Sequence, residues 1–240
     1  MSMLRNIISD ILALLFPREC AVCGDLLVEG EEFVCTACRF RIPMTGFATE
    51  ADNPMKERLS ALVPITHASA LFYFVAESDW RRIVHDFKYR GRWNKARRLG
   101  VWCGHTLLQS GNYQDVDIVV PVPLHLRKRL QRGYNQSDYI ADGIASVLGV
   151  GVEHHALVRK VNNESQTRHS RNERWGNVEG IFEVRKPELL SGRHVLLVDD
   201  VFTTGATVIA CCEAIFAACG DVRVSVATLS VSQKEFGFDR

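Results

Sequence analysis

The sequence lacks several features that would assign it to a large functional class. No G-x-x-x-x-G-K-[ST] segment occurs, which excludes a Walker A nucleotide-binding loop. No apolar run approaches the roughly 20 residues that a membrane-spanning helix needs, so no membrane insertion is expected. Internal repeats and low-complexity tracts are absent, and the net charge is only +1, so bulk electrostatics favours no class of partner.

The first 17 residues also lack the marks of a secretory signal peptide. Asp10 interrupts the apolar run, no A-x-A-like cleavage site follows, and a cysteine cluster begins at once. Leucine and isoleucine recur at helical spacing as far as Pro17, which predicts an amphipathic helix. We therefore expect a cytoplasmic protein, in a compartment where disulfides are rare.

The composition is typical of a globular protein with one ordinary domain and a small appendage, since 47% of its 240 residues are hydrophobic and 24% are charged. Predicted strands cover 69–75, 116–122, 152–158, 181–184, 194–198 and 222–231, and predicted helices cover 79–108 (with a break near Gly91), 137–148 and 205–219. This alternation predicts an α/β domain over 66–240 with a mostly parallel sheet flanked by helices. The prolines scattered over 43–66 predict a connector behind an N-terminal region at 1–55.

Four of the eight cysteines form the pattern C-x2-C-x11-C-x2-C, at Cys20, Cys23, Cys35 and Cys38. Two C-x-x-C turns offer the four thiolates that a tetrahedral structural zinc requires, so a zinc-finger-like module is predicted within 1–55. Two disulfides or a redox C-x-x-C are the alternatives, and a reducing compartment disfavours the first. The remaining cysteines lie in helical patterns and are predicted to be buried apolar residues: Cys103, Cys211, Cys212 and Cys219.

The run VLLVDDVFTTGAT, at 195–207, is the most informative segment of the chain. An apolar strand precedes Asp199 and Asp200, and a turn rich in threonine and glycine then begins a helix. Carboxylates can accept hydrogen bonds from ribose hydroxyls, and the N–H groups of such a turn can surround a phosphate. Receiver domains also contain Asp-Asp at a strand end, but near the start of the domain. The run resembles the signature with which type I phosphoribosyltransferases bind phosphoribosyl pyrophosphate (PRPP).

Positive charge is concentrated in the middle of the chain. Residues 80–135 contain twelve Lys and Arg against three acids, which marks a candidate anion-binding face. There, Pro121, Val122 and Pro123 end a strand, and Arg127 and Arg132 follow shortly before a helix. Because cations at a helix N-terminus oppose its dipole, a bound anion would explain them. Parallel strands end at one edge, so this segment is a candidate pyrophosphate site beside the acidic pair.

Two further segments contain clustered cations. The polar segment 159–182, with Arg171 and Arg174, is either a mobile lid over an anion or an ordered two-stranded excursion. In the basic run at 81–98, Tyr89 and Trp93 alternate with cations, which suits base stacking on single-stranded DNA. The helical pattern slightly favours the other interpretation, in which both rings face the core.

Six motifs in succession extend the resemblance: the four-cysteine pattern, an FK-x-x-G-type segment (Phe87, Lys88, Gly91), PVPLH, RGYNQS, a Q-T…R…N…F string and LLVDDVFTTGAT. Together they resemble the ComF family of bacterial competence-associated, phosphoribosyltransferase-like proteins, which includes GntX-type members. The resemblance covers essentially the whole chain. It departs at Tyr134, where phenylalanine is usual, and at His169, where an apolar residue is common.

The resemblance implies a type I phosphoribosyltransferase fold behind a zinc-binding N-terminal region. It implies that Asp199 and Asp200 are catalytic and bind the ribose of PRPP, that the loop after Val120 meets pyrophosphate with Mg²⁺, and that 159–178 is the flexible loop. The implied 5′-phosphate-binding residues are Thr203, Thr204, Gly205, Ala206 and Thr207. The implied activity is transfer of the phosphoribosyl (pentosyl) group to an unidentified acceptor, in nucleotide salvage or DNA uptake. The alternative is a non-catalytic PRPP-sensing or single-stranded-DNA-binding component that acts with other competence proteins.

Overall fold

The computed structural model of the protein describes residues 18–75, 78–160 and 180–236. Its helices are α2 (Thr36–Phe40), α3 (Pro54–Ser60), α4 (Trp80–Tyr89), α5 (Trp93–Ser110), α6 (Leu126–Arg132), α7 (Gln136–Leu148) and α8 (Ala206–Ala218). Its strands are β1 (Ala68–Phe74), β2 (Ile118–Pro121), β3 (Gly151–Val152), β4 (Leu157–Arg159), β5 (Phe182–Val184), β6 (His194–Phe202) and β7 (Arg223–Ser232). The helix predicted for the first 17 residues, Arg171 and Arg174 lie outside the described residues. Across the described ranges, no helix is long and apolar enough to cross a bilayer.

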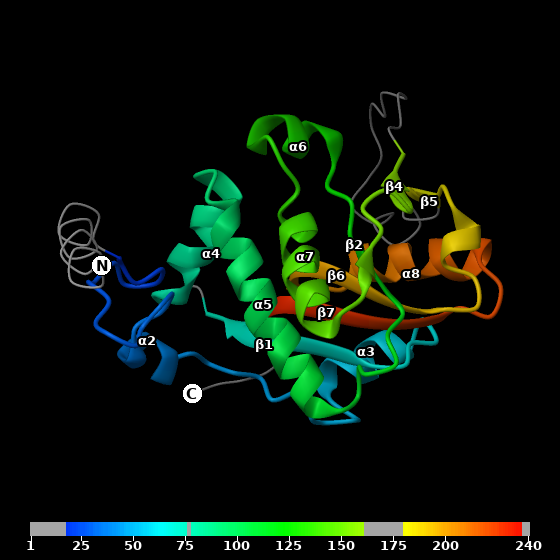
Figure 1. Ribbon diagram of the computed structural model, residues 1–240. Coiled ribbons are helices and arrows are strands. Elements are labelled where there is room, and N and C mark those ends of the chain that lie inside the picture. The colour runs from blue at the N-terminus through cyan, green and yellow to red at the C-terminus, as the bar shows by residue number, and fades with distance from the viewer. Residues whose placement is uncertain (1–17, 76–77, 161–179, 237–240) are drawn as a thin grey trace, which may run out of the picture.

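Five strands form one parallel sheet in the order β1-β7-β6-β2-β3 (Figure 1). The central strands β6 and β7 are buried along most of their length, as expected of parallel strands covered on both faces. The predicted α/β fold with a mostly parallel sheet is confirmed. Strands β4 and β5 form a separate antiparallel pair, so the two ends of the polar segment 159–182 are ordered.

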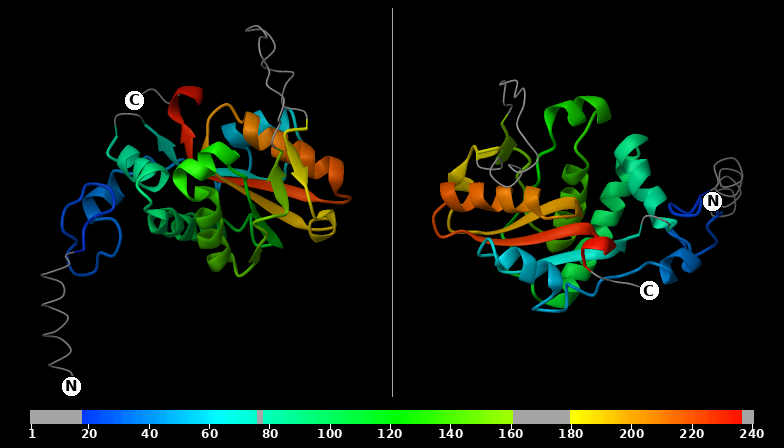
Figure 2. Two further views of the ribbon diagram at one scale, coloured as in Figure 1. Left: turned by 90° about the horizontal axis from the view of Figure 1, so that it is seen from above. Right: turned by 180° about the vertical axis from the view of Figure 1, so that it is seen from behind.

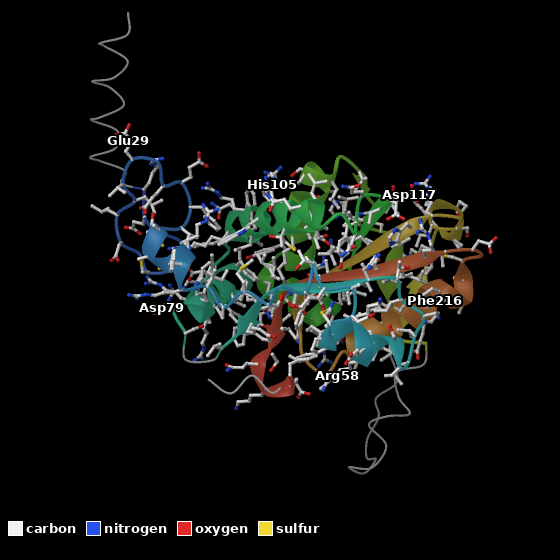
Figure 3. All side chains as sticks on the ribbon, turned by 90° about the horizontal axis from the view of Figure 1, so that it is seen from below. Glu29, Arg58, Asp79, His105, Asp117 and Phe216 are labelled. Atoms are coloured by element: carbon white, nitrogen blue, oxygen red, sulfur yellow. The ribbon has the colours of Figure 1, made fainter. Side chains whose placement is uncertain are left out.

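Alternating side chains of β6 divide the interior into two cores. Leu196 and Val198 pack with α4, α5 and α7, whereas Val195 and Leu197 pack with α3 and α8 on the other face. Figure 3 shows this arrangement from below, with the labelled His105 of α5 and Arg58 of α3 on opposite sides of the sheet. The cysteines outside the four-cysteine pattern are all buried here, as predicted.

Helices α5 and α7 pack so closely that glycine is required at their contact. A Cβ at Gly143 would lie 2.3 Å from the Arg97 carbonyl oxygen, and one at Gly100 would lie 2.3 Å from the Ile140 carbonyl oxygen. Both obstacles are backbone atoms, so a side-chain movement cannot relieve the overlap. The approach presses α7, whose first turn carries Gln136, against the sheet beside β2 and β6.

We expect Gly143→Ala to lower the free energy of unfolding by about 1–3 kcal/mol, because the added methyl group forces α5 and α7 apart. The gain in helix propensity of about 1 kcal/mol is too small to compensate. Denaturant unfolding measures the change. Gly151→Ala is the control, since a Cβ there meets nothing within 4 Å. Equal stability of the two variants would contradict the close contact.

Some local predictions differ from the structure. The connector predicted over 43–66 contains α3, which the Asn53 side chain caps and which buries Met55 and Leu59 completely. The single strand predicted at 152–158 is two short strands, β3 and β4. Helix α6 was not predicted, because it buries none of its residues and therefore shows no apolar periodicity. The domain limits 1–55 and 66–240 stay a prediction.

Residues 43–45 run along the outer edge of β1. The Tyr73 N–H donates to the Pro43 carbonyl at 2.7 Å, and the Thr45 N–H donates to the Leu71 carbonyl at 3.2 Å. Met44 and Phe72 form an isolated antiparallel bridge between these two bonds. The segment that leads out of the four-cysteine module therefore covers a strand that the parallel sheet leaves open on one side.

The four-cysteine module, residues 18–42, lies at one end of the molecule beside α4 and α5 (Figure 2). Arg82 donates to the Cys23 carbonyl at 3.1 Å, and Lys95 donates to the Ala21 carbonyl at 2.9 Å. Both carbonyls belong to the first C-x-x-C turn. The module is thus attached to the two helices through side chains of the basic run.

A buried carboxylate pairs with three cations of the basic run. Asp86 is 1% exposed and lies within 3.3 Å of cationic atoms of Arg90, Arg92 and Lys95. Tyr89 and Trp93 do not face the core, contrary to the prediction. Tyr89 is 59% exposed and Trp93 is 47% exposed. Their helical spacing was misleading because the two rings lie on either side of the break between α4 and α5.

Candidate functional site

Strand β6 carries the acidic pair to the end of the sheet where parallel strands finish. The strand continues to Phe202, so Asp199 and Asp200 lie within it rather than after it. Asp200 is buried, with 6% of its surface exposed, and its carbonyl accepts a long 3.4 Å bond from the Ser230 hydroxyl of β7. Pairing with β7, through Asp199 and Val201, fixes the backbone beneath the two carboxylates, whereas β2 pairs with β6 only as far as Val198.

Side chains from α7 and α4 surround the carboxylates. The Ser137 hydroxyl donates to Asp199 Oδ1 at 3.0 Å, and the Gln136 amide donates to Asp200 Oδ2 at 2.9 Å. Lys88 Nζ lies 2.8 Å from the same Asp200 oxygen. Asp199 Oδ2 and Asp200 Oδ1 accept no hydrogen bond from any described residue. Each acid therefore has one fixed oxygen and one oxygen open to a ligand donor.

The surroundings of Asp199 shift its pKa in opposite directions, with a net rise. Burial raises the pKa of Asp199, and the neighbouring charge of Asp200 raises that pKa further. The Asp200 N–H, the Ser137 hydroxyl and the Lys88 ammonium act in the opposite direction on the same pKa. Perturbed carboxylates of this kind concentrate in functional sites, although structural ion pairs also produce them.

The turn after β6 has the backbone geometry of an anion cradle. Gly205 has φ of 85°, and a Cβ there would lie 2.7 Å from the Phe202 ring, so glycine is required. Helix α8 begins at the next residue. Apart from a long 3.5 Å bond between the Ala206 N–H and Thr204 Oγ1, no described side chain caps its first turn. Its first N–H groups are therefore available to an anion.

A cavity of about 190 Å³ lies beside the acidic pair. Helix α6 stands away from the sheet above this region, between α4 and the β4–β5 hairpin (Figure 1). Of the predicted site residues, the cavity brings together Val122, Pro123, Arg132, Asp199, Asp200 and Thr207. It does not include Pro121, Arg127, Thr203, Thr204, Gly205 or Ala206 among its lining residues. The three threonines of this segment are nevertheless exposed: Thr203 and Thr204 in the turn, and Thr207 in the first turn of α8.

Several lining residues were not predicted as site residues: Lys88, His125, Lys128, Gln136, Ser137 and Arg159. Three of the motifs already contained four of these residues, since Lys88 belongs to the FK-x-x-G-type segment, His125 to PVPLH, and Gln136 and Ser137 to RGYNQS. Asn135 holds the RGYNQS motif at the cavity, because its side-chain amide donates to the Val122 carbonyl at 3.1 Å. That bond ties the start of α7 to the end of β2.

The four predicted metal ligands converge in the N-terminal module. The Sγ atoms of Cys20, Cys23, Cys35 and Cys38 all lie within 4.8 Å of one another. Those of Cys23 and Cys35 are 3.8 Å apart, close to the ~3.8 Å edge of a tetrahedron with Zn–S bonds of about 2.3 Å. All eight cysteines are described, and none forms a disulfide. The donor set and its spacing fit a closed, structural Zn²⁺ site.

Backbone donors support this set of sulfurs. The Cys35 N–H donates to Cys20 Sγ at 3.3 Å, and the Asp25 N–H donates to Cys23 Sγ at 3.5 Å. Although burial raises the pKa of Cys20, the backbone donors of Cys35, Cys23 and Val22 lower it to about 7. Burial raises the pKa of Cys23 to about 11 and also raises that of Cys38. The backbone bonds therefore favour the thiolate, the form that binds zinc, at Cys20.

Comparisons with known families agree with both parts of the chain. A phosphoribosyl transferase domain matches residues 136–234, and a double zinc ribbon domain matches residues 11–48. Among solved structures, the glutamine phosphoribosylpyrophosphate amidotransferase from B. subtilis has 18% identity and a TM-score of 0.42, covering 60% of this chain and 30% of that chain.

Two curated relatives carry names from DNA metabolism. The DNA utilization protein YhgH of Salmonella typhimurium is 33% identical over 129 residues, which are 52% of this chain and 56% of that protein. The competence protein ComFC of Bacillus subtilis is 36% identical over 90 residues, which are 38% of this chain and 34% of that protein. The match thus spans just over half the length of the Salmonella relative. The phosphoribosyl transferase domain, the four-cysteine ribbon and the relatives named for competence and DNA utilization together support a ComF-family, phosphoribosyltransferase-like protein.

Proposed function

We propose that the cavity binds PRPP and that the protein transfers its phosphoribosyl group to an unidentified acceptor, with release of pyrophosphate. One observation supports this most: the acidic pair keeps two oxygens open beside a cationic cavity and an uncapped helix start. Ribose hydroxyls would donate to Asp199 Oδ2 and Asp200 Oδ1. The 5′-phosphate would lie at residues 203–207, where N–H groups and threonine hydroxyls are available.

The pyrophosphate would lie toward α6 and β4. Lys128, Arg132 and Arg159 line the cavity and supply positive charge on that side. Arg127, which the sequence also suggested, is absent from the lining residues, so we assign it no contact with pyrophosphate. Mg²⁺ would arrive with the donor, on its pyrophosphate oxygens, and would offset the negative charge of the leaving group.

The chemistry requires little beyond placement and charge. The bond between C1 of the ribose and the pyrophosphate oxygen breaks, positive charge develops on the sugar, and an acceptor atom bonds to C1. The fixed carboxylates of Asp199 and Asp200 would orient the sugar and stabilise that positive charge. Cations already in place around the leaving group need no reorganisation during the reaction.

A two-stage experiment tests this function. Calorimetric titration of PRPP with Mg²⁺ measures donor binding first, with ribose 5-phosphate and pyrophosphate as partial ligands. Pyrophosphate release is then followed with a panel of purine, pyrimidine and other nitrogenous acceptors. Absence of PRPP binding would reject the proposal as a whole. Tight binding without turnover on any acceptor would reject the transferase and leave a PRPP sensor.

A second candidate function, binding of single-stranded DNA, is favoured by a groove between the four-cysteine module and α5. The groove encloses about 740 Å³, and Arg39, Arg97, Arg98 and Trp102 are among its lining residues. The guanidinium of Arg39 lies 5.7 Å from the centre of the Trp102 ring. Cations interleaved with aromatic rings suit a strand of stacked bases. The names of the relatives motivate the same proposal, which would link the protein to DNA uptake and to other competence proteins in the cytoplasm.

For this candidate, we expect the double charge reversal Arg97→Glu/Arg98→Glu to weaken binding of a fluorescent single-stranded oligonucleotide at least about 10-fold. The wild-type affinity should fall as salt rises, because phosphate contacts release counterions. Arg185→Glu/Arg193→Glu is the matched control, since both arginines are exposed and lie outside the groove. If the affinity does not change with salt concentration, or if both double variants retain it, this groove is excluded as a DNA site.

A further inference from the structure

Lys88 is a cation of the cavity to which the proposed reaction gives no role so far. Its Nζ lies 2.8 Å from Asp200 Oδ2, and the two side chains are only 20% and 9% exposed. Exposed salt bridges contribute little, but a pair withdrawn from water needs both partners. The contact is therefore a fixed part of the site rather than a surface ion pair.

Contacts at the C-terminal end of α4 hold Lys88 within reach of Asp200. Phe87, the preceding residue, is completely buried, and its carbonyl accepts a hydrogen bond from the Tyr134 hydroxyl. One residue earlier, the buried Asp86 holds Lys95 of α5 at 2.8 Å. Tyr134 belongs to the loop before α7, and a phenylalanine there could not make this bond. The departure from the usual family residue thus joins α4 to the segment that supplies Gln136.

Two donors meet at one oxygen of Asp200. Lys88 and the Gln136 amide both contact Oδ2, and the Gln136 oxygen in turn accepts from the Arg132 guanidinium at 3.0 Å. With Oδ2 held from α4 and α7, rotation of the carboxylate is restrained. Oδ1 is then presented in one orientation.

Lys88 also favours the ionised form of the acidic pair. Two adjacent carboxylates repel each other, and the Lys88 ammonium lowers the pKa of Asp199, which burial and Asp200 raise. The titratable groups that face this pair are His125 ahead of α6, Lys128 and Arg132 from α6, Arg159 from β4, Cys211 from α8 and Lys88 itself. Of these cations, Lys88 makes the direct ion pair.

We propose that Lys88 is a positioning residue of the donor site: it holds Oδ2 of Asp200 so that the open oxygens of the acidic pair meet the ribose hydroxyls. The inference rests on the proposed function, because it takes PRPP as the ligand of the cavity. It adds a residue from α4 to an acidic pair that is otherwise held by β6 and α7. Lys88 would therefore affect PRPP binding through the carboxylates of Asp199 and Asp200, and not by contacting a phosphate of PRPP.

The test compares Lys88→Met and Lys88→Arg with the wild type by PRPP titration from mildly acidic to alkaline pH. Arg90→Met is the control, because Arg90 lies two residues further along, pairs with the buried Asp86 and does not line the cavity. We expect Lys88→Met to weaken binding about 10- to 100-fold at neutral pH. The loss should shrink as pH rises, since the Asp199 carboxyl then ionises without its cation. Lys88→Arg should retain most of the affinity.

A second measurement needs no PRPP. Carbon NMR titration of the Asp199 carboxyl in the free protein should show a pKa higher in Lys88→Met than in wild type by about one unit or more. Equal affinities of Lys88→Met and wild type, an unchanged titration, or a loss of affinity that is constant across pH would each overturn the positioning role. A constant loss would indicate a direct phosphate contact instead. A wild type that does not bind PRPP rejects the donor site itself, and so the two failures are distinguishable. Thermal unfolding checks that the variants are folded.

Discussion

Asp200→Asn should reduce PRPP affinity about 100-fold, the larger of the two binding losses that the site predicts. The amide removes the charge on which the hydroxyl bond and the Lys88 ion pair both depend, and bonds to charged groups contribute about 1.5–3 kcal/mol each. Gln136 would also meet an amide in place of a full carboxylate. Calorimetric titration with Mg²⁺ measures the loss, and pyrophosphate release with any active acceptor should stop.

The control for this variant is Asp142→Asn. Asp142 lies in α7 and pairs with His154 at 3.1 Å, but it does not line the cavity. It should bind PRPP as the wild type does. If Asp200→Asn retained wild-type affinity in a protein that binds PRPP, the donor would lie elsewhere and the assignment of the acidic pair would be wrong. Circular dichroism establishes that the variant is folded.

Removal of zinc should have the largest effect on stability. We expect metal analysis of the reduced protein to give about one zinc per chain, and Cys35→Ser to abolish it. A structural zinc contributes on the order of 10 kcal/mol to the folding of a small module, far more than residues 18–42 can gain from their few buried side chains. Hydrogen exchange should therefore show that this module unfolds while the parallel sheet stays protected.

The control for zinc removal is Cys219→Ser, which replaces a thiol by a hydroxyl at the end of α8, away from the four-cysteine pattern. It should keep the metal and the protection of the module. A reduced protein without metal, in which the four thiols are free and the module is still protected, would contradict the zinc assignment. Disulfides among these cysteines in the protein as isolated would favour the alternative that the sequence left open.

The sequence predicts features whose determinants are local. The four cysteines, the acidic pair and the Thr-Gly turn each lie within a short segment, and each geometry follows from neighbours in the chain. The alternation of strand and helix patterns also predicted the parallel sheet, whose strands β6 and β7 are buried along most of their length. The assignment of PRPP contacts to individual residues of the turn stays a prediction.

Features that depend on tertiary contacts were missed. Lys88 meets Asp200 across 112 positions of the chain, and no spacing rule connects α4 with β6. Helix α6 follows its strand but packs against no core, so it leaves no periodic signal. The basic run was overestimated for a related reason, since only the fold shows that the buried Asp86 occupies three of its cations.

The segment that follows the four-cysteine module has a consequence for association between chains. A bare edge strand offers unpaired N–H and C=O groups to any other extended chain, and natural sheets protect such edges. Here the backbone of residues 43–45 occupies the free side of β1 by bonds to Leu71 and Tyr73. A shortened protein that began after Thr45 would expose this edge of β1, and self-association by strand addition would then compete with the native packing of the sheet.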